Sequence, residues 1–306
     1  MNGVLVVDKP AGPTSHAVVA RVRRAIGIAR VGHTGTLDPL ATGVLPLVVG
    51  RATRLAQFLT AGEKEYEAAI RLGAATRTYD ADDRMQTDPA SGARVLTEPP
   101  GAPENVDAAL VEAALANFTG TYLQAPPPFS AKKIGGVPAY KLARRNQPVD
   151  VRPVSVTVHS LTLERYENGL ARVRVACSAG FYVRSLAHGI GETLGCGAHL
   201  EALRRTRAGD FRLDQAIPLD EVERLGPAAA ARMVQMDALL PLLPPVVVNE
   251  AGARRAAHGN ALAPADLAES PEAVGSCVRV LDAEGTLLGI AEPTGSGLLH
   301  PVVVLV

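Results

Sequence analysis

The sequence predicts a mixed α/β protein that ends in a small β-barrel. Strand-like apolar runs alternate with helical patterns through residues 1–240, and Asn168-Gly169 separates two β-rich runs. Because Asn-Gly favours a tight hairpin, these two runs are expected to pair antiparallel. Short apolar runs near the C-terminus are spaced as in a small barrel. The proline-rich residues 241–245 form the best linker, so we expect one domain over residues 1–240 and a second over residues 246–306.

Caps and periodicity locate the elements of the N-terminal half. Thr14 or Ser15 can cap a helix whose apolar positions share one face, and Gly27 is suited to end it. The valine-rich run before this helix ends at Lys9-Pro10, as a strand that enters a turn does. We expect strands at residues 3–7, 44–49 and 66–72, and helices at residues 15–26, 51–59 and 105–118.

The C-terminal half begins with residues 124–152, whose prolines and paired glycines indicate a loop with a short helix near residues 139–144. Helical and loop elements are expected from residue 195 to residue 240. The other regular elements expected are strands at residues 154–163 and 171–178, a helix that follows residues 180–184 and ends near residue 194, and strands at residues 278–281, 287–291 and 302–306.

Composition favours a globular, cytoplasmic protein. The chain has 306 residues and a formal net charge of zero, so its totals give no sign of a polyanionic partner. No apolar run is long enough to span a bilayer, and the N-terminus lacks a signal peptide pattern. The three cysteines, Cys177, Cys196 and Cys277, are widely separated, which fits reduced thiols and gives no metal-ligand spacing.

Positive charge is nevertheless concentrated locally. Residues 124–152 contain six lysines and arginines and one aspartate, so six minus one leaves a local balance of +5. Smaller basic groups occur at residues 21–30, 204–207 and 254–255. Each group alone is typical of a solvated face, but their recurrence beside glycine-rich turns favours an RNA or DNA partner.

Residues 32–46 form the segment around which the other motifs are organised. Three glycines, two prolines and three threonines exclude a regular helix, so a long shaped loop is expected to run into the following strand. Asp38 is the only acid between Asp8 and Glu63, and Pro39 biases its backbone toward the extended region. From spacing alone, Asp38 fits a turn or helix cap better than a catalytic carboxylate.

Five motifs follow one another in a characteristic order along the chain. They are Asp8-Lys9-Pro10-Ala11-Gly12-Pro13-Thr14-Ser15, the block at residues 32–43, Lys64-Glu65-Tyr66, Pro127-Pro128-Phe129-Ser130-Ala131 with Lys133, and Gly180-Phe181-Tyr182-Val183-Arg184. Together they resemble the bacterial TruB family of tRNA pseudouridine-55 synthases. The resemblance covers about residues 1–240, and the C-terminal residues resemble a PUA RNA-binding domain.

The resemblance implies an activity, a partner and a fold. The implied reaction isomerises one uridine in the T loop of tRNA, detaching the flipped-out base from its ribose and rejoining it through carbon, without a metal or an organic cofactor. The implied fold is a large antiparallel-dominated sheet flanked by helices, with a central cleft and a basic RNA-binding insert at residues 124–152. We expect a monomer that needs no obligate protein partner and binds the T arm of tRNA.

The resemblance also assigns catalytic residues. Asp38 matches the nucleophilic aspartate, which attacks the ribose or the base; a carboxylate suits this step because it is ionised, nucleophilic and able to leave again. Arg184 matches the arginine that pairs with it, since a guanidinium favours the charged carboxylate. Tyr66 matches the tyrosine that stacks on the base and acts in removing the proton from carbon 5. By themselves, Arg184 fits an ordinary ion pair and Tyr66 fits strand packing.

Further matches are expected to bind the substrate. His33 matches the histidine that takes the place of the flipped base in the T-loop stack, an exchange that offsets lost stacking. By itself, His33 fits a turn histidine bonded to backbone. The remaining expected substrate-binding residues are Tyr182, Leu203, Asp80, Lys64 and Lys133.

Two positions depart from the family pattern. Ala179 stands where a lysine often precedes the Gly-x-Tyr-x-Arg motif, so one positioning charge is missing. Arg77 reverses the charge of the acidic turn that ends at Asp80, which puts the detailed role of that turn in doubt.

Three other functions fit part of the pattern. A non-catalytic tRNA-binding module would need only basic patches and the PUA-like end, but it would not need Asp38, Tyr66 and Arg184 together. A glycosidase or nucleoside hydrolase would want a second carboxylate, which residues 32–46 do not supply. A guide-RNA-dependent relative would be expected to carry lysine-rich tails, which are absent from this sequence.

Overall fold

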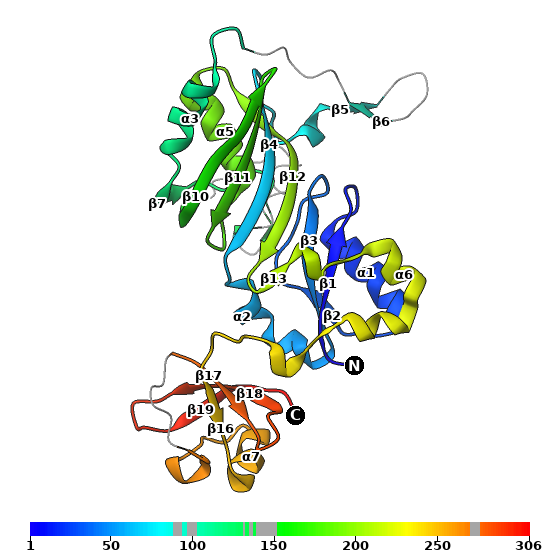
Figure 1. Cartoon of the computed structure of the whole chain (residues 1–306), viewed down its shortest axis with the longest axis vertical. Helices are drawn as coiled ribbons and strands as arrows, with labels where there is room; N and C mark the ends of the chain where they lie inside the picture. Colours follow the sequence, from blue (N-terminus) through cyan, green and yellow to red (C-terminus); the bar gives the residue numbers. More distant parts are fainter. Residues whose placement is uncertain (88–93, 97–102, 131, 135–136, 139–151, 270–275) are drawn as a thin grey trace.

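The structure is a computed structural model of the whole chain, shown in Figure 1. It describes residues 1–87, 94–96, 103–130, 132–134, 137–138, 152–269 and 276–306. The helix expected near residues 139–144 lies outside the described residues. None of the described helices is both long and apolar enough to cross a membrane.

A long, mostly antiparallel sheet forms the centre of the molecule and confirms the predicted fold class. Only the pairings β1–β14 and β3–β12 are parallel among the strands of this sheet that the structure describes. In spatial order its strands are β14 (Ile217–Pro218), β1 (Gly3–Lys9), β3 (Thr42–Val49), β12 (Ala198–Ala208), β4 (Lys64–Leu72), β11 (Leu170–Cys177), β10 (Val154–Glu167) and β7 (Gly120–Gln124). Short strands β2 (Val31–His33), β13 (Phe211–Arg212) and β15 (Val234–Gln235) pair with β3, β12 and β1.

Two groups of helices pack on the sheet at separate places (Figure 1). Helices α1 (Ser15–Ile26) and α6 (Leu219–Leu225) lie beside β1. Helix α3 (Ala108–Ala116) packs against β10, and α5 (Val183–Leu194) packs against α3 and β12. Side chains from α1, α3 and α5 belong to one continuous apolar cluster with the sheet. A short connection, η1 (Gly50–Leu55) followed by α2 (Ala56–Thr60), leads from β3 into β4.

Local sequence signals account for several of these elements. Thr14 Oγ1 accepts a hydrogen bond from the backbone N–H of Ala17, and Gly27 ends α1 at φ 71° in the left-handed region. Asn168 and Gly169 both have positive φ, 48° and 74°, which joins β10 to β11 by the tight turn that Asn-Gly favours. The predicted helix at residues 15–26 and the predicted hairpin are therefore confirmed.

One prediction was wrong. Residues 198–208 were expected to be helical or loop, but they form β12, a central strand between β3 and β4. Alanine, leucine, glutamate and arginine dominate this stretch and favour a helix in isolation. The neighbouring strands override that preference, since β12 is hydrogen-bonded along both edges.

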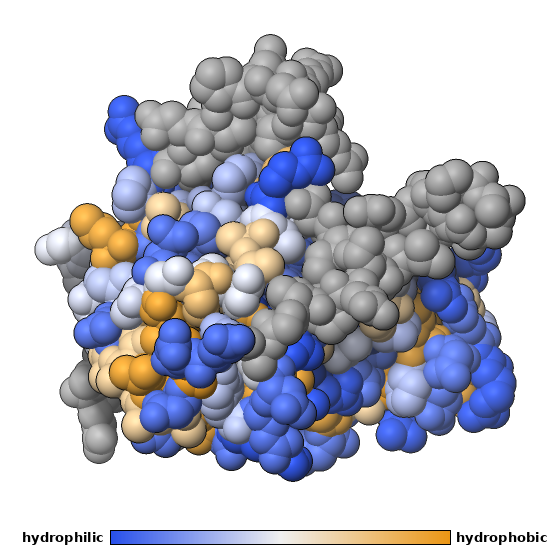
Figure 2. Space-filling view, turned by 90° about the horizontal axis from the view of Figure 1, so that it is seen from above, coloured by the Kyte–Doolittle hydropathy of each residue, from blue (hydrophilic) through white to orange (hydrophobic). Residues whose placement is uncertain are grey.

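Two small hairpins project from the large sheet. One pairs β5 (Met85–Thr87) with β6 (Arg94–Leu96), and η2 (Ala81–Arg84) leads into it. The other pairs β8 (Lys133–Ile134) with β9 (Val137–Pro138) inside the basic segment. Viewed from the end where β5 and β6 project, the described surface is mainly hydrophilic with scattered apolar side chains (Figure 2).

The C-terminal residues form a second sheet, ordered β16 (Pro245–Val247), β17 (Val278–Leu281), β18 (Leu287–Pro293) and β19 (Leu299–Val304). Leu262 exchanges backbone hydrogen bonds with Leu299 at one edge, and Ala268 donates to Val247 at the other. The segment between them therefore closes the sheet into a small barrel, with α7 (Glu250–Ala257) packed against it. The connection from β15 to β16 includes η5 (Met236–Ala238), and η6 (Pro264–Asp266) lies within the closing segment. Two further 3-10 helices lie within the large-sheet part: η3 (Leu213–Gln215) between β13 and β14, and η4 (Gly226–Arg232) between α6 and β15.

The two sheets share an apolar cluster. Alternate side chains of β1 face opposite sides: Leu5 belongs to the helix-covered core, whereas Val4 and Val6 face the C-terminal sheet. There they join Ile290 and Leu305, both at most 2% exposed. The division into residues 1–240 and 246–306 remains a prediction, but the two sheets pack through a buried interface rather than only through a tether.

Candidate active site

A cavity of about 480 Å³ opens beside the loop that carries Asp38. Its walls come from that loop, from β4, from β12 and from the start of α5. Seven of the nine expected site residues line it: His33, Asp38, Lys64, Tyr66, Tyr182, Arg184 and Leu203. Ala179 also lines the cavity, without the positive charge that the family pattern often has there.

The carboxylate of Asp38 is paired with Arg184. Arg184 Nε lies 2.8 Å from Oδ2, and Nη2 donates to Oδ1 at 3.2 Å. The guanidinium is 6% exposed, whereas the Asp38 side chain is 34% exposed and open to the cavity. The hydrogen bond from Nη2 and the close approach of Nε fix the direction of the Asp38 carboxylate. The predicted pair is therefore present, with its acid on the accessible side.

The Arg184 guanidinium also contacts groups other than Asp38, which hold it in place. Its Nη1 donates to the carbonyl of Thr78 and its Nη2 to that of Phe129, each at 3.0 Å. Asp80 Oδ2 lies 3.5 Å from Nη1, and burial raises the pKa of Asp80 to about 6. Asp80 is 4% exposed, lies outside the cavity lining and contacts Arg184. Its expected contact with the substrate stays a prediction.

The turn that ends at Asp80 is anchored by Tyr79. Its backbone has φ 63°, an uncommon conformation for a residue with a large side chain. The Tyr79 ring stacks on His188 of α5 with a centroid separation of 3.9 Å, and its carbonyl accepts from Leu200 N–H. Because α5 carries both His188 and Arg184, this stack ties the turn to the helix that supplies the guanidinium.

Two buried polar side chains shape the loop on either side of Asp38. Ser15 Oγ accepts from Leu37 N–H at 2.8 Å and donates to the Leu37 carbonyl at 3.0 Å. Lys9 Nζ donates to the carbonyls of Pro39 and Ala41 at 3.2 and 2.6 Å. Lys9 is 0% exposed, and burial lowers its pKa to about 8. The Lys9 and Thr14-Ser15 motifs therefore support the loop from beneath.

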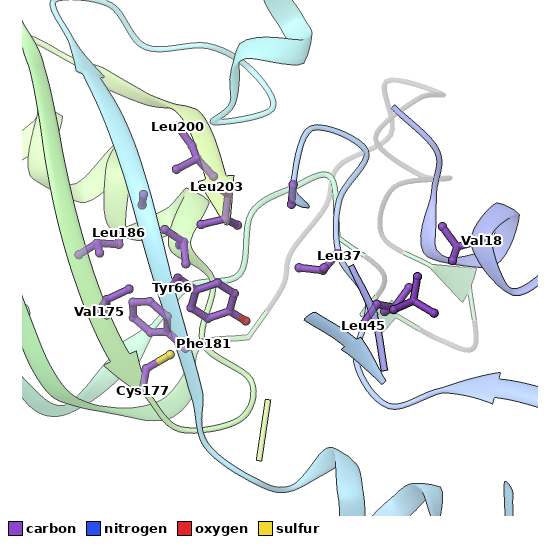
Figure 3. Close-up of a cluster of buried hydrophobic side chains, with 14 of the residues drawn as sticks. Val18, Leu37, Leu45, Tyr66, Val175, Cys177, Phe181, Leu186, Leu200 and Leu203 are labelled. Carbon is purple, nitrogen blue, oxygen red and sulfur yellow. The ribbon is translucent and has the colours of Figure 1, made fainter. Parts of the chain in front are cut away.

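Tyr66 belongs to an apolar wall of the cavity. Figure 3 shows its ring beside Phe181 and Leu203, with the loop that carries Leu37 on the opposite side. Tyr66 and Leu203 are each 8% exposed. Burial raises the pKa of Tyr66, so its hydroxyl is neutral at physiological pH. A flat apolar wall facing a carboxylate suits a planar base placed between them.

The backbone of Tyr182 is held by two hydrogen bonds to the Gln124 side chain. Gln124, 4% exposed, accepts from the Tyr182 N–H at 2.8 Å and donates to its carbonyl at 3.1 Å. Tyr182 is the N-cap of α5, so this pair of hydrogen bonds also fixes where the helix begins. In the sequence, Gln124 is only the first residue of the basic segment, and an isolated glutamine gives no indication of this role.

Lys64 and His33 lie at other parts of the cavity lining. Lys64 Nζ donates to the carbonyls of Thr60 and Gly62, and burial lowers its pKa to about 8. His33 meets His16 edge to face with a centroid separation of 5.3 Å, and burial lowers the pKa of His33. Lys133 lies in β8, and its side chain is outside the described residues.

Sequence reasoning missed Arg205. It was grouped with Arg204 and Arg207 as a basic patch, but its side chain is 1% exposed and reaches the cavity wall. Arg204 is paired with Asp8, and Arg207 with Glu63 and Glu65. In a strand every second side chain faces the same side, so Leu203 and Arg205 are buried together. This alternation could not be recognised from the sequence because residues 198–208 were not expected to form a strand.

Comparisons with known proteins agree with this arrangement. Family models match consecutive parts of the chain: the TruB family pseudouridylate synthase N-terminal domain at residues 23–183, the tRNA pseudouridylate synthase B C-terminal domain at residues 184–246, and the C-terminal domain of pseudouridine synthase II TruB at residues 244–305. The fold and the paired carboxylate thus define a pseudouridylate synthase.

Relatives that match nearly the whole chain indicate which family of pseudouridylate synthases it belongs to. A tRNA pseudouridine synthase B of Solibacter usitatus is 45% identical, with 100% of both chains covered. One from Burkholderia pseudomallei is 42% identical over 98% of this chain and 96% of its own. The chain belongs to the TruB family of pseudouridylate synthases.

Solved structures share the fold. A chain in an H/ACA RNP bound to a substrate RNA containing 2′-deoxyuridine is 25% identical, with a TM-score of 0.72 over 99% of this chain and 85% of that one. A chain in a Cbf5-Nop10-Gar1 complex is 26% identical, with the same TM-score and coverage.

Proposed function

We propose that this chain isomerises uridine 55 in the T loop of tRNA to pseudouridine, with Asp38 as the nucleophile. The observation that carries the proposal is the Asp38–Arg184 pair, which presents an oriented carboxylate to a cavity walled by Tyr66. The relatives named tRNA pseudouridine synthase B match this chain over nearly their whole length, which supports tRNA as the substrate.

In the proposed reaction the flipped uracil lies against Tyr66 and Leu203, and Asp38 attacks the ribose or the base. The bond between C1′ and N1 breaks, a bond between C1′ and carbon 5 forms, and the bond to Asp38 breaks so that the carboxylate is regenerated. The hydrogen on carbon 5 then leaves as a proton, with Tyr66 acting in its removal, and N1 gains a proton. His33 fills the gap in the RNA stack.

The test is tritium release from tRNA labelled at carbon 5 of uridine. Wild-type protein is expected to release tritium, and Asp38→Asn, which keeps the shape but loses the nucleophile, to lower release by at least about 10³-fold. Asp210→Asn, at an exposed turn, is the matched control and should release tritium as wild type does. Undiminished release by Asp38→Asn would contradict the mechanism; tRNA binding without release by wild type would favour a binding module.

We also propose how the chain meets its substrate. Residues 124–152, with Lys133, and residues 246–306 supply RNA contacts outside the cavity, and the protein acts as a cytoplasmic monomer. The local balance of +5 in the first segment supports this contact. The salt dependence of tRNA binding by Lys132/Lys133→Ala tests the contact by residues 124–152, and an unchanged salt slope would contradict it. The mass in solution tests the monomeric state, and a dimeric mass would contradict it.

A further inference from the structure

Arg205 is a buried cation that the mechanism above does not use. It is the largest side chain in the part of the chain the structure describes that is less than 2% exposed. The described residues give it no salt bridge, although its neighbours Arg204 and Arg207 both have carboxylate partners. A buried guanidinium without a carboxylate is costly, so its place in the fold needs another explanation.

Two backbone carbonyls that flank Asp38 accept hydrogen bonds from Arg205. Its Nε donates to Val44 at 2.7 Å, and its Nη2 donates to Gly35 at 3.2 Å. Residues 35 and 44 lie on either side of Asp38, so one planar guanidinium joins the first part of the loop to β3, which begins at Thr42. Lys9 and Ser15 bond to residues inside this span, whereas Arg205 closes it.

The backbone of Arg205 touches the same loop. Arg205 is paired with Gly43 in the parallel register of β12 and β3, and a Cβ added at Gly43 would lie 2.2 Å from the Arg205 carbonyl oxygen. Gly43 has φ 98°, a conformation that favours glycine. The end of the loop therefore lies directly against β12, and only glycine permits that approach.

On its other edge, Arg205 is paired with Tyr66. The antiparallel register of β12 and β4 sets Arg205 opposite Tyr66, and the register shifts between Leu200 and Ala202 and again between Arg205 and Arg207. The stretch between these two irregularities carries Leu203 and Arg205, which both line the cavity. Bulges re-aim side chains in this way beside active sites.

We propose that Arg205 is a positioning residue that locks the Asp38 loop to β12 and so sets the nucleophile in register with Tyr66. The inference rests on the proposed function. The guanidinium fork, rather than its charge alone, performs this role, because two separate carbonyls must be reached from one rigid group. Lysine keeps the charge but offers a single nitrogen.

The test compares Arg205→Lys and Arg205→Met with Arg207→Lys, a matched change on the same strand. Single-turnover tritium release is measured at saturating tRNA. Both Arg205 variants are expected to be about 100-fold slower, because a misplacement of about 1 Å costs that much. Their Kd for tRNA should stay within about twofold of wild type, and Arg207→Lys should match wild type in both quantities. A wild-type rate in Arg205→Lys, or a loss confined to Kd, would overturn the proposal.

A second readout does not depend on activity. Amide hydrogen exchange at residues 35–44 should be at least about tenfold faster in Arg205→Met than in Arg207→Lys, while exchange in α1 and β10 stays unchanged. Unchanged exchange in the loop would refute the lock even if the wild-type enzyme is active. Absence of tritium release by wild type, with faster loop exchange in Arg205→Met, would refute the proposed function and leave the lock standing.

Discussion

At the scale of single residues, the site is a carboxylate and a guanidinium supported by buried polar groups. Asp38 faces the cavity, and Arg184 is fixed by two carbonyls and by Asp80. This support costs free energy, because Asp80 is nearly inaccessible to solvent and burial raises its pKa to about 6. Burying a carboxylate at this cost does not stabilise the fold, so we infer that the role of Asp80 is to orient the Arg184 guanidinium.

The cost of burying Asp80 predicts that the difference in the free energy of unfolding between Asp80→Asn and wild type depends on pH. Between the ordinary value of 3.8 and about 6, native Asp80 keeps a proton that the unfolded chain has lost, so the stability of wild type falls as pH rises. The amide of the Asp80→Asn variant does not titrate. The free energy of unfolding of Asp80→Asn relative to wild type should therefore rise by about 2 kcal/mol from pH 4 to pH 7.

Urea unfolding across this pH range checks the prediction for Asp80, and Asp210→Asn serves as the exposed control. The same Asp80→Asn protein should isomerise uridine more slowly, because Arg184 loses one of its restraints. A difference in stability that stays flat with pH would show that Asp80 is not held at a raised pKa.

At the scale of elements, those with local signals could be predicted and those defined by partners could not. Helix α1 and the β10–β11 hairpin were found because a cap and a turn dipeptide act within a few residues. Strand β12 was missed because its residues favour a helix until β3 and β4 pair with it. Arg205 was missed with it. Asp38, Tyr66 and Arg184 were found through family motifs. By themselves the residues favoured a turn cap for Asp38 and strand packing for Tyr66, and Arg184 fitted an ordinary ion pair as well.

Helix α5 should be sensitive at the glycine where it meets β12. A Cβ added at Gly191 would lie 2.1 Å from the backbone nitrogen of Ala198, at the start of the strand. Gly191→Ala must therefore displace α5, which carries Arg184, and should lower the free energy of unfolding by about 3 kcal/mol. Urea midpoints and single-turnover tritium release measure the two effects. Gly295→Ala, where a Cβ meets nothing within 4 Å, should leave both unchanged.

At the scale of the whole molecule, the two sheets are joined by a shared core. Val4, Val6, Val44 and Val48 of the large sheet pack in one cluster with Leu287, Ile290, Val303 and Leu305 of the small one. Arg54 adds a hydrogen bond to the Val304 carbonyl, and Asp237 accepts from the Leu287 N–H. Removing the residues after the proline-rich stretch would uncover an apolar face, so truncation cannot separate RNA binding from stability.

A point change in the shared core tests this coupling. Leu305, 2% exposed, loses its packing in Leu305→Ala, which should cost about 2–4 kcal/mol. Because the catalytic sheet lies on the other side of the contact, the urea concentration that abolishes tritium release should fall together with the far-UV circular dichroism midpoint. Val306→Ala, at a residue 46% exposed, should change neither. An activity midpoint unaffected by Leu305→Ala would mean that the two sheets unfold independently.

The shared core also bears on how an RNA must be shaped to react. Since side chains, and not a flexible tether, hold the small barrel in place, the molecule offers two surfaces at a constant separation. An RNA that reaches both has to match that span while it delivers a base to the cavity. If an RNA contacts both surfaces, its own bending, and not a hinge between the two sheets, must bring the base to the cavity.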